Sequence, residues 1–310
     1  MQMPKKKERL EIALRSERIC YRNLDVYRVS RPFIRSLCRV CNLDLGPLPS
    51  VISNMSPQPT FVLVPGALHT PAHLQLLADS LEAKGYPTQI FSLPSVGALA
   101  TTAPPNIDAV KLRENLNDLV KNEQKEVILF CHSYGGIPAS QSVKGLERSA
   151  RAKAGEKGGI VKVIFQSAFL PLEGENVVDI LTRSEVPPGD QWLEPDPASG
   201  TLKANSNTAA VLYHDLPDDQ AQKWISKLEP MYGHAVPGPA AVNVCWDVDV
   251  AKVAILCKKD RAILFEGQQR MLKRAQGVKN DGWEIYELDC GHCPIVSHVG
   301  ELTEILIKGA

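Results

Sequence analysis

The stretch EVILFCHSYGG, residues 126–136, decides how this sequence of 310 residues folds. An apolar run rich in branched side chains is typical of a buried strand, and here it leads directly into Ser133. When a chain turns sharply from a strand into a helix at a serine, nearby glycines relieve the crowding between helix and strand. Gly135 fits this pattern, whereas Cys131 stands where a first glycine is usual. We therefore expect a bend that presents Ser133 above the end of the strand.

Short apolar runs alternate with helical patterns on both sides of this bend. Apolar strands are expected at 60–66, 88–95, 126–131, 161–169, 253–257 and 283–288, and helices at 71–86, 107–123 and 135–155. This alternation predicts an α/β fold, in which a doubly wound, mostly parallel sheet is covered by helices on both faces. Residues 171–245 interrupt the alternation, with one expected helix at 218–228 and no evident buried strand. We interpret them as an insert that lies over the sheet.

The composition limits the class of protein. Hydrophobic residues make up 44% of the chain and charged residues 23%, as in ordinary globular proteins. The formal net charge of zero gives no electrostatic reason to expect binding to nucleic acid. No run approaches the roughly 18 apolar residues of a membrane span, and no apolar core near the N-terminus suggests a secretory signal. Eight scattered cysteines indicate reduced thiols rather than a disulfide scaffold, so we expect a cytoplasmic protein.

The first 57 residues differ from the remainder, and we expect the α/β domain to span residues 58–310. Residues 1–54 contain 11 Lys and Arg against 5 Asp and Glu, and a segment rich in Pro and Ser follows. We interpret residues 1–57 as a basic extension and linker. A mitochondrial targeting segment is one alternative, although its acidic residues argue against it. A natural start at Met55 is another.

A serine becomes an effective nucleophile only when a base accepts its proton and an acid orients that base. Two candidates follow Ser133 in the sequence. Asp260 comes just after the expected strand 253–257, and His292 comes just after the expected strand 283–288. Because parallel strands end at the same edge of a sheet, these side chains are expected to meet Ser133 there. The sequence therefore predicts a Ser133–His292–Asp260 catalytic triad.

An acyl-transfer site also needs two hydrogen-bond donors for the oxyanion. The backbone N–H of Tyr134, the residue after the nucleophile, is one candidate, and that of Ala67, in the loop after the first strand, is the other. Gly66 allows this loop to approach closely. The substrate pocket is expected to include Leu68, His69, Trp192, Trp224 and Met231.

Two C-x-x-C pairs raise the question of a zinc site. Cys38–Cys41 and Cys290–Cys293 lie roughly 250 residues apart, and the second pair surrounds the proposed base. Zinc bound there would withdraw His292 from the triad. We therefore expect no metal site.

The chain resembles the α/β-hydrolase superfamily, and within it the small esterase-like branch of the plant methylesterases and hydroxynitrile lyases. The resemblance rests on VLVPGALHTPAHL, DLVKNEQKEVILFCHSYGG, SAFLP, LYHDLPDDQAQKW, CKKDRAIL and CGHCPIVSH, and it covers the chain from about Phe61 to Leu306. It implies the same triad and oxyanion donors, a helical cap at 171–245, and neither a metal nor an organic cofactor. Pro65 departs from the family, which usually has a histidine there, and Cys131 departs where relatives have glycine.

The expected function is that of a serine hydrolase. It would cleave a carboxylic ester or lactone of a small to medium apolar molecule through an acyl-enzyme, as a monomer or a homodimer. One alternative is a hydroxynitrile lyase or a C–C bond-cleaving enzyme, assisted by an insert lysine such as Lys223 or Lys227. Another is a small-molecule receptor with a vestigial triad.

Overall fold

The computed structural model describes most of the chain beyond the N-terminal segment. The described residues are 58–97, 104–186, 192–235, 238–279 and 282–308. Our expectations for residues 1–57 lie outside these ranges. No helix in the described part of the chain combines the length and apolar composition that a membrane crossing requires.

Six strands of the described chain form one sheet. They are β1 (Thr60–Val64), β2 (Thr88–Ile90), β3 (Glu126–His132), β4 (Gly159–Gln166), β8 (Ala251–Cys257) and β9 (Trp283–Leu288). Their order is β2-β1-β3-β4-β8-β9, and every neighbouring pair is parallel. The predicted doubly wound parallel sheet is thereby confirmed. Because all six strands run the same way, their carboxyl ends share one edge, where ligands bind in open α/β sheets.

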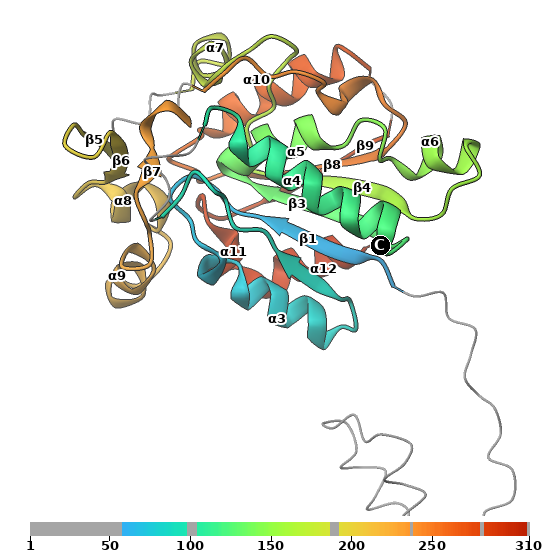
Figure 1. The fold of residues 1–310 in the computed structure, drawn as a ribbon. Helices are drawn as coiled ribbons and strands as arrows, with labels where there is room; N and C mark the ends of the chain where they lie inside the picture. The colour runs from blue at the N-terminus through green and yellow to red at the C-terminus, as the bar shows by residue number, and fades with distance from the viewer. Residues whose placement is uncertain (1–57, 98–103, 187–191, 236–237, 280–281, 309–310) are drawn as a thin grey trace, which may run out of the picture. The chain divides into compact units, whose positions relative to one another are not determined.

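Helices cover both faces of this sheet (Figure 1). They are α3 (Gln75–Ala83), α4 (Ile107–Asn117), α5 (Gly136–Ser142), α6 (Arg148–Lys153), α10 (Phe265–Gln276), α11 (Pro294–Ser297) and α12 (Val299–Ile307). Helix α3 packs against α12 on one face, and α4 packs against α5 on the other. The strands between them are apolar on both sides, so that Leu63, Ile128 and Phe130 are completely buried. Burial on both faces explains their nearly continuous apolar sequences.

One helix expected from the sequence is divided into two in the structure. The pattern predicts a single helix over 135–155, but α5 ends at Ser142 and α6 begins only at Arg148. Gly145 lies between them with a φ of 82°, a conformation that favours glycine. Glu147 then forms an isolated parallel bridge to Ile160 of β4. Pairing with the sheet therefore interrupts the helix.

The segment between β4 and β8 forms an insert at the end of the sheet toward which the strand arrows point (Figure 1). It contains α7 (Val177–Arg183), β5 (Leu193–Asp196), β6 (Thr201–Ala204), α8 (Thr208–Leu212), α9 (Asp218–Ile225) and β7 (Met231–Tyr232). Helix α9 confirms the helix expected at 218–228. The three short strands form an antiparallel sheet in the order β5-β6-β7, which the sequence pattern did not predict. The insert faces the carboxyl edge of the main sheet, where Ser133 lies.

Candidate active site

Ser133 occupies the sharp bend between β3 and α5. Its φ of 53° lies in the left-handed region, which is strained for a residue with a side chain. Gly135 makes the bend possible, because a Cβ there would lie 2.6 Å from the carbonyl oxygen of Pro65. A Cβ on Gly136 would overlap the carbonyl oxygen of Phe169. The two glycines therefore allow the helix to begin directly against the neighbouring loops, as the sequence pattern requires.

The two departures from the family pattern both pack under this bend. Cys131 is completely buried in β3, and its thiol donates a hydrogen bond to the carbonyl of Ile164 at 3.3 Å. Pro65 directly follows β1, and its carbonyl lies against Gly135. Neither side chain contributes an atom to the hydrogen bonds of Ser133.

Three side chains from the ends of three strands form one hydrogen-bonded chain. Nε2 of His292 lies 3.0 Å from Oγ of Ser133, and Nδ1 of His292 lies 2.7 Å from Oδ2 of Asp260. A carboxylate oxygen can only accept a hydrogen bond, so Nδ1 carries the imidazole proton. Nε2 is then free to accept the proton of the serine. The structure thus brings together the three residues predicted from positions far apart in the sequence.

Asp260 is held by four donors, although it is almost completely buried. Oδ1 accepts hydrogen bonds from the backbone N–H groups of Ala262 and Ile263, at 2.8 and 2.9 Å. Oδ2 accepts from Gln268 at 3.2 Å as well as from His292. Hydrogen bonds to both oxygens hold the carboxyl group in one orientation. The orientation of His292 is therefore fixed by a carboxylate that cannot turn freely.

A cavity opens above Ser133, beneath the insert. Its empty volume, which includes space open to solvent, is about 480 Å³. Ala67, Ser133 and Tyr134 form one side of it, where the two backbone N–H groups expected to bind an oxyanion belong. The remaining walls are apolar and consist of Phe169, Val177, Leu181, Trp192, Leu193, Ala262 and Ile263. The cavity therefore suits an apolar group attached to a carbonyl.

Of the five residues predicted to line the pocket, the structure places Trp192 in its wall and the other four elsewhere. Leu68 is completely buried and His69 nearly so. The backbone carbonyl of Trp224 bonds Nε2 of His73 at 3.1 Å, and Met231 pairs with β6 inside the insert. The amino groups of both insert lysines lie over the ring of Trp224, at 5.7 Å for Lys223 and 4.5 Å for Lys227. Neither lysine lines this cavity.

The described domain matches a known family over most of its length. Residues 61–305 match the model of the alpha/beta hydrolase family. The chain belongs to the alpha/beta hydrolase family. Among its relatives, the Probable hydrolase R7 of Phoma sp. is 27% identical over 261 residues, which cover 82% of this chain and 98% of that protein.

The relatives also include plant esterases. Putative methylesterase 19 of Arabidopsis thaliana is 26% identical over 267 residues, covering 80% of this hydrolase and 96% of that protein. The crystal structure of polyneuridine aldehyde esterase has the same fold, with a TM-score of 0.63 at 16% identity. That match covers 81% of this chain and 98% of the esterase chain. The protein is therefore an enzyme of the hydrolase type, related to the plant methylesterases.

A row of histidines lies beneath the floor of the hydrolase site. The ring centroids of His69 and His132 are 5.3 Å apart, and those of His132 and His292 are 4.8 Å apart. Nδ1 of His69 donates to the carbonyl of Ala67 at 2.8 Å, which turns the ring away from the cavity and explains why it does not line it. Burial lowers the pKa of both His69 and His132 well below the usual value. Both imidazoles are therefore neutral.

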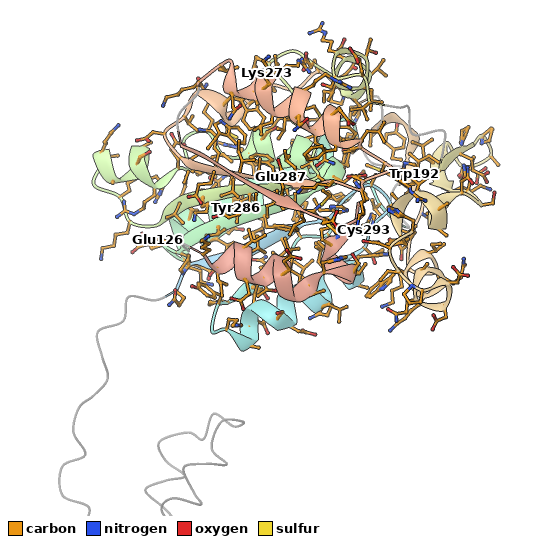
Figure 2. All side chains as sticks on the ribbon, turned by 180° about the vertical axis from the view of Figure 1, so that it is seen from behind. Glu126, Trp192, Lys273, Tyr286, Glu287 and Cys293 are labelled. Atoms are coloured by element: carbon orange, nitrogen blue, oxygen red, sulfur yellow. The ribbon has the colours of Figure 1, made fainter. Side chains whose placement is uncertain are left out.

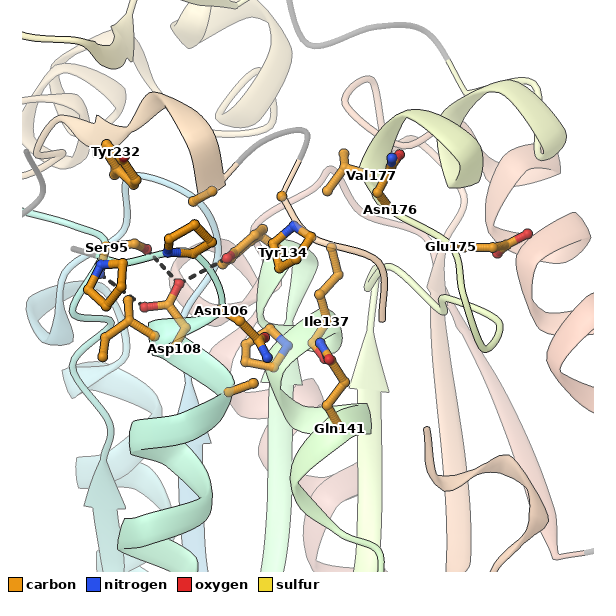
Figure 3. A pocket seen from close by; sticks show the side chains of 18 residues that line it. Ser95, Asn106, Asp108, Tyr134, Ile137, Gln141, Glu175, Asn176, Val177 and Tyr232 are labelled. Atoms are coloured by element: carbon orange, nitrogen blue, oxygen red, sulfur yellow. Dashed lines mark hydrogen bonds between the residues drawn. The ribbon is translucent and has the colours of Figure 1, made fainter. Parts of the chain in front are cut away.

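A second cavity of about 470 Å³ adjoins the first, because Tyr134 and Val177 line both (Figure 3). Asp108 is buried in its wall and accepts hydrogen bonds from Oγ of Ser95 at 2.6 Å and from the hydroxyl of Tyr134 at 2.9 Å. Burial raises the pKa of Asp108. Burial also raises the pKa of Tyr134 well above its usual value, so its hydroxyl stays protonated. The side chain of Tyr134 is thus fixed by Asp108.

Several residues of the site were not predicted from the sequence. Gln268 contacts Asp260, but it lies on α10 among other helical positions, and nothing in its sequence context marks it. Phe169 could have been predicted as a pocket residue, because it follows β4 at the same edge of the sheet as Ser133. Val177 and Leu181 are one turn apart on α7, an insert helix whose position relative to the sheet was unknown.

Proposed function

We propose that this alpha/beta hydrolase cleaves a carboxylic ester or lactone of a small to medium apolar molecule through an acyl-enzyme. The observation that carries the proposal is the hydrogen-bonded chain from Ser133 through His292 to Asp260, which ends at an apolar cavity. This is the arrangement that activates a serine for attack on a carbonyl carbon.

In the first half of the reaction, Oγ of Ser133 attacks the carbonyl carbon while Nε2 of His292 takes the hydroxyl proton. The imidazolium that forms is stabilised by Asp260. The carbonyl oxygen becomes an oxyanion, which accepts hydrogen bonds from the backbone N–H groups of Ala67 and Tyr134. Collapse of this intermediate breaks the bond to the alcohol, which leaves with the proton from His292. The acyl group remains on Ser133.

In the second half, water takes the place of the alcohol. His292 removes a proton from the water, whose oxygen attacks the acyl carbon, and a second oxyanion forms on the same two N–H groups. When the bond to Ser133 breaks, the proton on His292 returns to the serine oxygen. The enzyme is regenerated and the carboxylic acid is released.

The cavity walls support an apolar substrate of limited size. Apart from Ser133 at the floor, its lining side chains are apolar or aromatic. A charged group next to the scissile carbonyl would lose its hydration there without gaining a partner. An ester with an aliphatic or aromatic acyl group suits this cavity better than a charged one.

The decisive experiment compares wild type with Ser133→Ala on short p-nitrophenyl esters and on lactones. We expect kcat to fall by at least about 10³-fold, because the remaining groups cannot form an acyl-enzyme. Ser140→Ala is the matched control, because Ser140 is a buried serine of α5 whose hydroxyl bonds the carbonyl of Ile137. This control should keep near wild-type activity. Unchanged turnover by Ser133→Ala would overturn the assignment.

The same assays separate hydrolysis from the other reactions on this fold. Turnover in ¹⁸O-labelled water should place one labelled oxygen in the carboxylic acid product. A lyase would instead release hydrogen cyanide from a cyanohydrin without incorporating water. A receptor would bind the ester tightly, and neither wild type nor Ser133→Ala would turn it over. Either of these last two results would contradict the proposed hydrolysis.

A further inference from the structure

Three side chains that take no part in the proposed reaction lie close together beneath the floor of the cavity above Ser133. Sγ of Cys293 lies 3.7 Å from Nε2 of His69 and 3.8 Å from Nε2 of His132. Ligating atoms of all three residues lie within 4.8 Å of one another, and the three side chains are buried. Figure 2 shows Cys293 at the same end of the domain as Trp192, far from Glu126 at the start of β3. The cluster therefore lies at the carboxyl edge of the sheet.

The spacing of this cluster is close to that of a metal site. A tetrahedral ion with a sulfur ligand at about 2.3 Å and nitrogen ligands at about 2.0–2.1 Å separates sulfur from nitrogen by about 3.6 Å. The two observed sulfur–nitrogen distances already approach this value. The two nitrogens of such a site lie about 3.4 Å apart, so the imidazoles need to approach by at most about 1.4 Å.

The orientation of His69 also suits a ligand. The carbonyl of Ala67 accepts the proton of Nδ1, which leaves a lone pair on Nε2 directed toward Cys293. A carbonyl that fixes the tautomer and the ring orientation in this way is the usual partner of a metal-binding histidine. The hydroxyl of Tyr213 lies 3.1 Å from the same Nε2 and would have to give up this contact when an ion binds.

The thiol of Cys293 is completely buried. A divalent cation bound there would replace the proton of the thiol, which leaves to solvent, and the resulting thiolate would offset one of the two charges of the ion.

We propose that His69, His132 and Cys293 form a buried site for a divalent transition-metal ion of the zinc type. Thiolate and imidazole ligands in a tetrahedral arrangement are the set that Zn²⁺ and Co²⁺ prefer. This site differs from a zinc site built on the cysteine pairs Cys38–Cys41 and Cys290–Cys293. Cys293 is the only cysteine of these pairs that takes part in it, and His292 takes no part.

Binding at this site inhibits the enzyme. His132 directly precedes Ser133, and Cys293 directly follows His292. An ion that draws the two ligands together therefore displaces the nucleophile and the base from their 3.0 Å contact. A displacement of about 1 Å at reacting groups can cost up to about 100-fold in rate. This effect on rate rests on the proposed function, whereas the binding of metal does not.

Cobalt titration of the full-length, chelator-treated protein tests the binding. Co²⁺ should bind at one ion per chain and produce a sulfur-to-cobalt charge-transfer band together with the intense visible bands of a tetrahedral site. X-ray absorption on the zinc-loaded protein should find one sulfur at about 2.3 Å and two nitrogens at about 2.0–2.1 Å. To allow for slow entry, the ion is added both to folded protein and during refolding.

Substitutions of single residues identify the side chains that bind the ion. Cys293→Ser should abolish the charge-transfer band, and His132→Asn should weaken binding at least tenfold. Cys245→Ser, which removes another buried thiol, and the double variant Cys38→Ser/Cys41→Ser should both retain the band. Zinc should raise the melting temperature of wild type and leave that of Cys293→Ala unchanged, which keeps the test valid if one variant folds poorly.

Two results would overturn the proposal. One is the absence of the band after both loading procedures. The other is a band that survives Cys293→Ser but disappears in Cys38→Ser/Cys41→Ser. If zinc binds as described while Ser133→Ala retains full esterase activity, the metal site stands and the proposed function fails.

Discussion

Gln268 donates a hydrogen bond from Nε2 to Oδ2 of Asp260 at 3.2 Å, on the same oxygen that accepts from His292. Gln268 is itself fixed, since Nε2 also donates to the carbonyl of Ile263 at 2.7 Å and Oε1 accepts from the backbone N–H of Cys257 at 3.0 Å. The amide thereby joins the end of β8 to the loop that carries Asp260. It is a positioning residue for the base.

Replacing this amide by an apolar side chain of similar size should slow catalysis. For Gln268→Met we expect kcat to fall by about tenfold with KM nearly unchanged, since one hydrogen bond to a charged group is worth about 1.5–3 kcal/mol. Steady-state kinetics on a p-nitrophenyl ester provides the measurement. Gln75→Met is the matched control, because Gln75 makes an exposed bond to Asp79 at 2.8 Å. Equal kinetics for both variants would contradict the positioning role.

The second prediction concerns the glycine that lets α5 approach the β4 loop. In Gly136→Ala the new methyl group overlaps the carbonyl of Phe169 and lies 3.0 Å from Cβ of Ala168. We expect the free energy of unfolding to fall by about 1–3 kcal/mol, and activity to fall with it. A Cβ added at Gly300, on α12, meets no atom within 4 Å.

Gly300→Ala should therefore raise the free energy of unfolding by about 0.5–1 kcal/mol, because alanine restricts the unfolded chain. Urea unfolding of both variants tests the pair. Similar stability changes in the two would show that the space around Gly136 does not limit its side chain.

The third prediction concerns the pH dependence of stability at Asp108. Because burial raises its pKa in the folded state above the ordinary value of 3.8, the folded protein holds this proton more tightly than the unfolded chain does. The resulting stabilisation is complete below the ordinary pKa and is lost as pH rises through the folded-state pKa. Asp108→Asn has no proton to lose at this position.

The free energy of unfolding of wild type, minus that of Asp108→Asn, should therefore decrease as pH rises across the acid range. Urea unfolding of both proteins from about pH 3.5 to pH 7 measures this difference. A difference that grows with pH would mean that the bonds from Ser95 and Tyr134 outweigh burial.

The fourth prediction concerns the size of the acyl group. Val177 lines the cavity above Ser133, whereas its neighbour Val178 is 53% exposed. In Val177→Phe we expect kcat/KM to fall about tenfold more for octanoyl than for acetyl esters, since one methylene in a pocket is worth about 1–3 kcal/mol. Val178→Phe should show no such dependence on chain length. An equal loss for all esters would remove Val177 from the acyl-binding wall.

The strands, and the positions of Ser133, Asp260 and His292 just after them, were predictable because their signals are local in the sequence. Each buried strand is a short apolar run, and each of Ser133, Asp260 and His292 follows such a run within a few residues. Parallel strands place these ends at one edge, so the sequence alone suggests that the three side chains meet.

The cavity walls were not predictable in the same way. Of the wall residues from the insert, Trp192 was predicted, whereas Val177 and Leu181 were not, because the position of the insert depends on contacts with the rest of the chain. The strands β5, β6 and β7 are short and lack a clear alternation of apolar and polar residues, so no local pattern marks them. His69 has the local signal of a pocket residue, but one bond to the carbonyl of Ala67 turns it inward.

His132 and Ser133 are adjacent in the chain, yet the imidazole faces the interior cluster and the hydroxyl faces the cavity. The same holds for Cys293 and His292, whose side chains diverge from one short loop. During evolution, a substitution that alters the interior cluster therefore shifts the reacting groups as well. Relatives that differ in this layer should differ in turnover even where every residue that touches the substrate is identical.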